Sequence, residues 1–122
     1  MKVKQTDIAW AGGFFDGEGS SVCRINNGNP FSIMQITLGQ KDYKGSIAPT
    51  LIRFQEILGV GKIYRKTLTG KEIDMHQFYV CKFVDVQRTI KLLWNYISEP
   101  KKQQFIRNAK LLKQYSGKDI LK

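Results

Sequence analysis

The sequence predicts a single α+β domain in which helices cover one face of a four-stranded antiparallel sheet. Four segments carry apolar residues at helical spacing, and four shorter segments alternate apolar and polar residues as strands do. The strands come in two pairs, each joined by a short turn rich in glycine and asparagine or lysine. The order αββαββαα runs through all 122 residues without a linker, so we expect one domain over residues 1–122.

The first helix is predicted at residues 7–17, with Thr6 or Asp7 as its cap. It contains glycines that each cost about 0.5–1 kcal/mol relative to alanine inside a helix. Small residues at every fourth position form a smooth ridge, along which a second backbone can approach closely. The residues expected on this ridge are Ala9, Gly12, Gly13 and Gly17.

The first strand pair is predicted at residues 20–26 and 31–40, around the turn sequence NNGNP. Its alternation places Met34, Ile36 and Leu38 toward the core. A helix over residues 48–58 follows, with Pro49 in its first turn.

The second strand pair is predicted at residues 61–67 and 73–83, with Phe78 and Val80 facing the core. Asp85 is expected to cap a third helix that continues to Ile97, and Pro100 separates it from the last one. Trp10 and Trp94 are predicted core residues.

The other face of the sheet is predicted to carry side chains that hydrogen-bond base edges and phosphates. A strand of about nine residues spans about 30 Å, which covers about eight or nine base pairs of duplex. An ordinary solvated sheet face is the alternative interpretation. The residues expected on this face are Val22, Arg24, Asn26, Ile33, Gln35, Thr37, Lys62, Tyr64, Lys66, Gln77 and Tyr79.

Charge favours a polyanionic partner. Twenty Lys and Arg against ten Asp and Glu give a net charge of +10, spread along the chain, and a pI near 9.8. This composition fits ribosomal proteins, repressors and nucleases equally well. Cys23 and Cys81 lie far apart without metal-ligand spacing, which predicts two core thiols in a reducing compartment. The N-terminal residues lack the apolar stretch of a signal peptide.

One motif is specific. The stretch AGGFFDGEGSS at residues 11–21 closely resembles the signature of LAGLIDADG homing endonucleases, which often reads LAGFFDGEGS. Ala11 and Gly12 stand where that signature usually has Leu and Ala. The resemblance continues in the element order and in GQKD, LGVGKIY and PKKQQF further along the chain. It implies the αββαββα fold of that family, with a saddle-shaped sheet and helices packed on one face.

The resemblance also implies a catalytic site. Glu18, which closes the motif, would bind a divalent metal beside the scissile phosphate, with the Gly17 carbonyl as a companion ligand. Gln40 would orient water, Lys44 would complete the pocket, and Lys101 would stabilise transition-state charge, with Lys102 as the alternative lysine. Asp16 is interpreted as structural rather than as a ligand. His76, the only histidine, lies far from the motif in sequence and is not expected to act as a base.

A single motif implies a homodimer whose motif helices pack at the dimer axis. The expected activity is a Mg²⁺-dependent double-strand break with 3′ overhangs at a long pseudo-palindromic DNA site. Mn²⁺ is expected to replace Mg²⁺, and Ca²⁺ to support binding without cleavage. Neither a membrane nor a small-molecule substrate is expected. Proteins of this type are intracellular, in an organelle (mitochondrion or chloroplast) or in prokaryotic or phage-infected cytoplasm.

Two other functions remain open at this point. A relative that binds nucleic acid without cutting it, such as an intron maturase or a transcription regulator, would need neither Glu18 nor Gln40. A ribosomal or other RNA-binding protein would explain the charge but not the motif.

Overall fold

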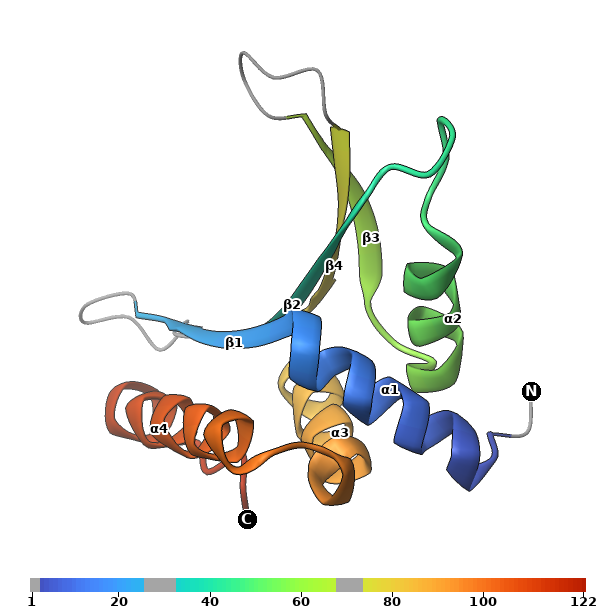
Figure 1. Cartoon of the computed structure of the whole chain (residues 1–122). Coiled ribbons are helices and arrows are strands. Elements are labelled where there is room, and N and C mark those ends of the chain that lie inside the picture. The colour runs from blue at the N-terminus through green and yellow to red at the C-terminus, as the bar shows by residue number, and fades with distance from the viewer. Residues whose placement is uncertain (1–2, 26–32, 68–73) are drawn as a thin grey trace.

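The computed structural model describes residues 3–25, 33–67 and 74–122. Its elements alternate helices and strand pairs in the predicted order (Figure 1). They are α1 (Gln5–Glu18), β1 (Gly19–Arg24), β2 (Ile33–Lys41), α2 (Pro49–Leu58), β3 (Lys62–Thr67), β4 (Asp74–Val80), α3 (Phe83–Leu93), the short 3₁₀ helix η1 (Trp94–Tyr96) and α4 (Glu99–Ser116). Among these helices, none combines the length and the apolar character needed to cross a bilayer.

The four strands form one antiparallel sheet in the order β1-β2-β4-β3. The sheet is strongly bent: in Figure 1, β1 runs across the view, whereas β3 and β4 rise upward. α1, α3 and α4 lie below it and α2 lies beside β3, so the opposite face stays open. This is the predicted α+β architecture, with helices on one side of the sheet.

The core lies between the sheet and the helices. Met34, Ile36 and Leu38 of β2 and Phe78 and Val80 of β4 are buried there, as the alternation predicts. The phenylalanines of the motif helix join this core from two sides. The Phe15 ring stacks on Phe105 of α4 at 5.4 Å, and the Phe14 ring meets the edge of Phe54 of α2 at 5.6 Å.

Polar bonds fasten α4 to the edge strand β1. Gln104 Oε1 accepts a hydrogen bond from the backbone N–H of Ser21, and Asn108 Nδ2 donates to the Ser21 carbonyl. An edge strand exposes backbone groups that otherwise pair with foreign chains. Here α4 satisfies both backbone groups of Ser21, which holds the start of β1 against α4.

Several predicted details of the helices are wrong. The first helix begins at Gln5 after Lys4, and Asp7 sits one turn inside it, where its carboxylate accepts from the Lys4 N–H. The third helix begins at Phe83, so Asp85 lies in its first turn. Its last predicted turn is the separate 3₁₀ helix η1, because the chain there bends to reach Ser98 at the start of α4. Trp10 and Trp94 are only partly buried, and of the two predicted core thiols Cys81 is exposed and Cys23 is half-buried.

Candidate catalytic site and nucleic-acid interface

The motif helix ends at Glu18, whose side chain is exposed. Gly19 follows at once as the first residue of β1, and a Cβ there would lie 2.6 Å from the Phe15 ring. Only glycine fits this close approach between the helix end and the strand. The chain therefore turns from helix to strand within one residue, and the Glu18 carboxylate stands at that turn.

Lys101 is the lysine that lies at this turn. Its Nζ donates to the Gly19 carbonyl and lies 5.8 Å from the centre of the Phe15 ring. Lys102 points elsewhere, with its Nζ 5.5 Å from the Trp94 ring centre. Of the two candidate lysines, the structure brings Lys101 to the end of the motif helix.

Asp16 has a structural partner. Its Oδ1 accepts two hydrogen bonds of 2.7 Å from the N–H and the hydroxyl of Ser98, the residue that begins α4. These bonds, the backbone one first, lower the pKa of the Asp16 carboxyl, and the nearby charge of Lys101 acts in the same direction. This geometry agrees with the structural interpretation of Asp16.

Gln40 lies near the motif end by strand register. β1 starts with Gly19 opposite Leu38, so Gln40 lies on β2 two residues beyond the partner of the first β1 residue. Gln40 Nε2 donates to the carbonyl of Gly39, its own neighbour. The Gln40 side chain is therefore held against its own strand, near the end of β2 that lies beside the start of β1.

Lys44 lies in the turn beyond β2, where it adopts a positive φ of 50°. Its Nζ lies 5.4 Å from the ring centre of Tyr43, and its side chain is exposed. No interaction within the described part of the chain joins it to Glu18.

His76, for which the sequence predicts no catalytic role, is buried in the sheet. It pairs with Gln40 across β2 and β4, faces the core side and is 7% exposed. Its Nδ1 lies 3.8 Å from Asp42 Oδ1, and both atoms are buried without a hydrogen-bond partner in the described structure. The alternation of β4 places His76 on the same side as Phe78, so its burial on the core side could have been predicted from the sequence.

The donor set at the motif end fits a hard cation. The Glu18 carboxylate and the Gly17 carbonyl supply oxygen ligands of the kind that Mg²⁺ prefers. Within the described ranges, however, no group of three His, Cys, Asp or Glu side chains could hold a metal ion. One chain supplies a single free carboxylate here, because Asp16 is engaged by Ser98. Further oxygens would have to come from another chain, from phosphates or from water.

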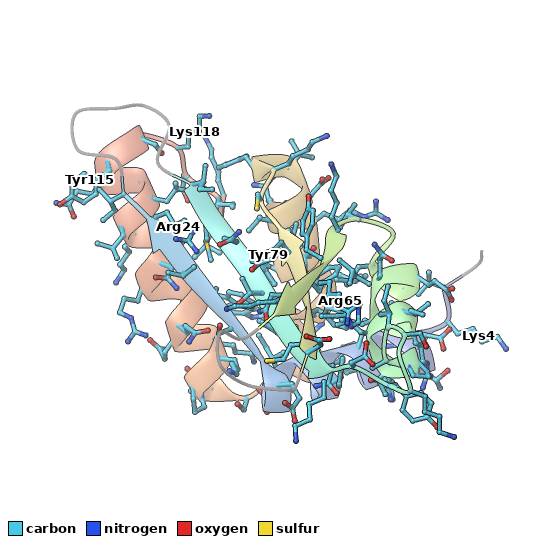
Figure 2. All side chains as sticks on the ribbon, turned by 90° about the horizontal axis from the view of Figure 1, so that it is seen from above. Lys4, Arg24, Arg65, Tyr79, Tyr115 and Lys118 are labelled. Atoms are coloured by element: carbon cyan, nitrogen blue, oxygen red, sulfur yellow. The ribbon has the colours of Figure 1, made fainter. Side chains whose placement is uncertain are left out.

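Most residues predicted for the open face do lie there. Figure 2 views this face and labels Arg24 on β1 and Tyr79 on β4. Lys62, Tyr64 and Lys66 of β3 stand opposite Tyr79, Gln77 and Met75 in the sheet. The Tyr64 and Tyr79 rings lie 5.9 Å apart, and Tyr64 is 53% exposed. The remaining described members of the set are Val22, Ile33, Gln35 and Thr37, whereas Asn26 lies outside the described residues.

Gln35 differs from its neighbours on this face, because it is only 8% exposed. Its Oε1 accepts from Arg24 Nε at 3.0 Å, and its Nε2 donates to Cys81 Sγ at 3.1 Å. Both ends of this amide therefore already have partners within the chain.

The small-residue ridge is narrower than predicted. Gly13 and Gly17 are exposed, and a Cβ at either would meet nothing within 4 Å. Gly12 is instead buried, and a Cβ there would lie 2.4 Å from Cβ of Tyr96 in the same chain. The prediction of Gly12 as part of a dimer surface is therefore wrong. Ala9 is half-buried, so Gly13 and Gly17 are the open part of the ridge.

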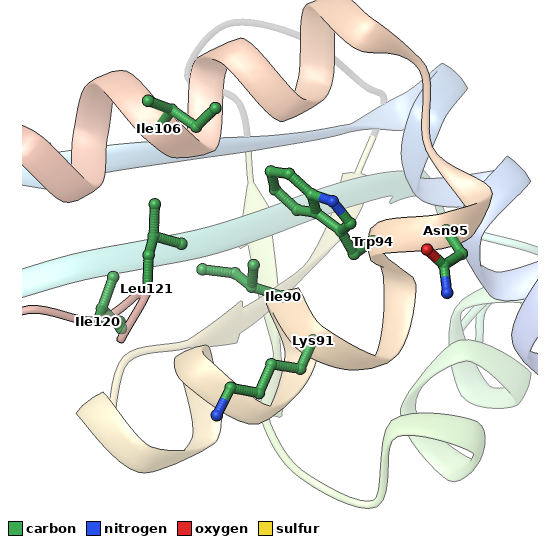
Figure 3. A pocket seen from close by; sticks show the side chains of 7 residues that line it. All are labelled: Ile90, Lys91, Trp94, Asn95, Ile106, Ile120 and Leu121. Carbon is green, nitrogen blue, oxygen red and sulfur yellow. The ribbon is translucent and has the colours of Figure 1, made fainter.

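An apolar hollow of about 390 Å³ lies on the helical side, between α3, α4 and the C-terminal residues (Figure 3). Ile90, Trp94, Ile106 and Ile120 form much of its wall, and Lys91 is its one titratable group. None of the residues that line the hollow is acidic, and neither Glu18 nor Lys101 is among them.

Known structures resemble the whole of this fold. The homing endonuclease I-CvuI, solved with its target in the presence of calcium, is 22% identical with a TM-score of 0.66. The match covers 91% of this chain and 68% of that one. The LAGLIDADG homing endonuclease I-GzeII, in complex with its DNA target, is 23% identical with a TM-score of 0.69, over 93% of this chain and 38% of that one.

A third similar structure is the archaeal intron-encoded homing endonuclease I-Vdi141I, complexed with DNA. It is 19% identical with a TM-score of 0.64, over 92% of this chain and 80% of that one. No protein-family model matches the sequence, and the comparison with curated proteins gives no match. The three structures share their arrangement with this chain over more than nine-tenths of its length, and the chain has the fold of the LAGLIDADG homing endonucleases.

Proposed function

We propose that this protein is a site-specific DNA endonuclease. Acting as a homodimer, it would bind a long pseudo-palindromic duplex and make a metal-dependent double-strand break with 3′ overhangs. The observation that carries the proposal is the end of α1, where the exposed Glu18 carboxylate and the Lys101 ammonium flank one turn of backbone. The resemblance to endonucleases solved with DNA supports it.

The open face supplies the binding surface. Its cations on β1 and β3 (Arg24, Lys62 and Lys66) lie among hydrogen-bonding and aromatic side chains. Lys and Arg contribute affinity through phosphates, and polar side chains contribute discrimination through base edges. β2 has nine residues, which at about 3.3 Å each is long enough to follow about nine base pairs.

Each chain would contribute one acidic group to the cutting site. Glu18 and the Gly17 carbonyl would hold Mg²⁺, which when bound neutralises phosphate charge and makes water a better nucleophile. Lys101 would stabilise negative charge on the phosphate during the reaction. Gln40 would position the attacking water. A dimer in which two chains contact each other along Gly13 and Gly17 would supply further oxygen ligands. It would also provide one cutting group for each DNA strand.

The direct test is a plasmid-cleavage assay with a library that carries candidate target sites. We expect linear product with Mg²⁺ or Mn²⁺, and binding without product when Ca²⁺ replaces them. Sequencing of the ends should reveal 3′ overhangs. Specific binding without cleavage in any of these metals would instead identify a non-cleaving relative, and absence of both would contradict the proposal.

A further inference from the structure

Gln35 and Arg24 form a hydrogen-bonded unit on the open face of the sheet. Arg24 is the last residue of β1, opposite Ile33, and Gln35 lies diagonally across from it on β2, opposite Val22. The bond from Arg24 Nε to Gln35 Oε1 measures 3.0 Å, and the bond from Gln35 Nε2 to Cys81 Sγ measures 3.1 Å. The unit therefore runs from β1 across β2 to the residue after β4.

The amide of Gln35 is fixed at both ends. Its oxygen is used by Arg24, its nitrogen by Cys81, and its side chain is almost entirely covered. A buried amide with satisfied partners holds its rotamer, because turning it would leave polar groups unpaired. Gln35 therefore holds Arg24 in a fixed position and does not itself extend from the sheet.

Arg24 keeps its charge and one edge of its guanidinium available. The bond to Gln35 occupies Nε, and the two terminal nitrogens have no partner among the described residues. The described strands place no acidic side chain on this face to neutralise them. The two terminal nitrogens form a planar pair of donors whose direction is set by the bond at Nε.

Among base edges in the major groove, guanine offers the matching pair of acceptors, N7 and O6. Adenine presents one acceptor and one donor, and an arginine fork cannot satisfy that pattern. We propose that Gln35 is a positioning residue that aims Arg24 at a guanine, so that the protein requires guanine at one position in each half-site. This inference rests on the proposed DNA-binding function.

The experiment is a selection from duplex DNA randomised over about twenty base pairs, the length that two sheet surfaces span. Dimeric protein is used with Ca²⁺, so that bound duplexes are recovered intact. Wild type is compared with two variants. Arg24→Lys keeps the positive charge but loses the paired terminal nitrogens of the guanidinium. Gln35→Met keeps the length of the side chain but loses the hydrogen bonds to Arg24 and Cys81. Lys66→Ala is the matched control, because it removes a cation from the same face outside this unit.

We expect wild type to favour guanine at one symmetric position by at least about fivefold. Arg24→Lys and Gln35→Met should both lose that preference at the same position. Gln35→Glu keeps the acceptor for Arg24 Nε but loses the donor to Cys81, so it should lower the guanine preference without abolishing it. Lys66→Ala should weaken binding to all sequences without changing the base chosen there. Cys81→Ala removes the sulfur that accepts from Gln35 Nε2 but leaves the bond between Gln35 and Arg24, so it should give an intermediate guanine preference.

The outcomes separate two failures. If wild type enriches no sequence, the proposed function itself fails. If wild type enriches a site but Gln35→Met, with an unchanged melting temperature, keeps the full guanine preference, Gln35 does not position Arg24 and the inference is overturned. Loss of preference in Gln35→Met at a different position from Arg24→Lys would overturn it as well.

Discussion

Asp16 and Ser98 join the end of the motif helix to the start of α4, through two hydrogen bonds of 2.7 Å to one carboxylate oxygen. The acid lies two residues before Glu18, and the serine three residues before Lys101. This contact ties together the two segments that supply the groups proposed for cleavage. Its strength depends on the charge of Asp16.

The contact predicts a pH-dependent stability difference between wild type and Asp16→Asn. The hydrogen bonds from Ser98 lower the pKa of folded Asp16 below that of an ordinary aspartate, so its stabilisation is fully present above the ordinary pKa. The stabilisation is lost as the pH falls through the folded-state pKa. We expect wild type to be the more stable protein near neutral pH, by less than about 1 kcal/mol because water screens this exposed contact, and the difference to shrink as the pH falls below the ordinary pKa of an aspartate. Thermal unfolding of both proteins without divalent metal measures it, and a constant difference over this range would contradict the assignment.

Lys101 and Lys102 provide a matched pair of variants. Each change to methionine removes one positive charge from the same turn of α4, but only Lys101 reaches the Gly19 carbonyl. We expect Lys101→Met to lower the cleavage rate by about 10²–10³-fold, the effect typical of a lost transition-state donor. Lys102→Met should cut at close to the wild-type rate. Single-turnover cleavage of one cognate duplex gives both numbers, and equal effects would mean that only net charge matters.

Glu18→Gln should abolish cleavage while sparing binding. The amide keeps the length of the side chain but loses the charge that would hold Mg²⁺, and several kcal/mol of transition-state stabilisation would go with it. The open face of the sheet is untouched, so a gel shift on the same duplex should give an affinity equal to or above that of wild type. A variant that still cuts at near wild-type rate would remove Glu18 from the mechanism.

Gly13 and Gly12 should respond differently to substitution, although they are neighbours. A side chain at Gly13 enters open space in one chain, so we expect Gly13→Leu to fold and to sediment as a monomer. Gly12→Ala forces a Cβ against Tyr96 and should destabilise the fold by about 1–3 kcal/mol. Sedimentation and thermal unfolding of both variants test the pair. An intact Gly13→Leu dimer would disprove the proposed role of the ridge.

Binding should weaken steeply with salt. The logarithm of the association constant falls with the logarithm of salt concentration at a slope of about −0.9 for each phosphate neutralised. A chain with a net charge of +10, doubled in a dimer, should neutralise many phosphates. A titration with Ca²⁺ fixed should therefore give a slope several times steeper than one contact produces. A nearly flat titration would place the bound DNA away from the basic face.

The fold could be predicted because its periodicities are local. The alternation in β2 and β4 assigned Met34, Ile36, Leu38 and Phe78 to the core, and all four are buried. The ends of helices were predicted less well. At Asp85 and Ile97 they depend on how the chain packs against distant elements, which spacing alone does not reveal.

The site was predictable where a motif marked it and not where partners come from other strands. The sequence could not choose between Lys101 and Lys102, because that depends on the rotation of α4 about its axis. It assigned Gln35 to a reading role, because alternation identifies a face but not the neighbours that bury a side chain there. Gly12 was misplaced for the same reason, since its partner Tyr96 lies far along the chain.

The direct junction of α1 and β1 at Gly19 has a consequence for how such a protein evolves. No spacer separates the proposed cutting group from the first recognition strand, and the Phe15 ring and the Lys101 bond leave no room to insert one. In the proposed complex, the fold therefore fixes the distance along the DNA between the cut and the bases that β1 would contact. If the protein cuts as proposed, substitutions on the open face would change which bases are recognised without changing where the cut lies relative to them.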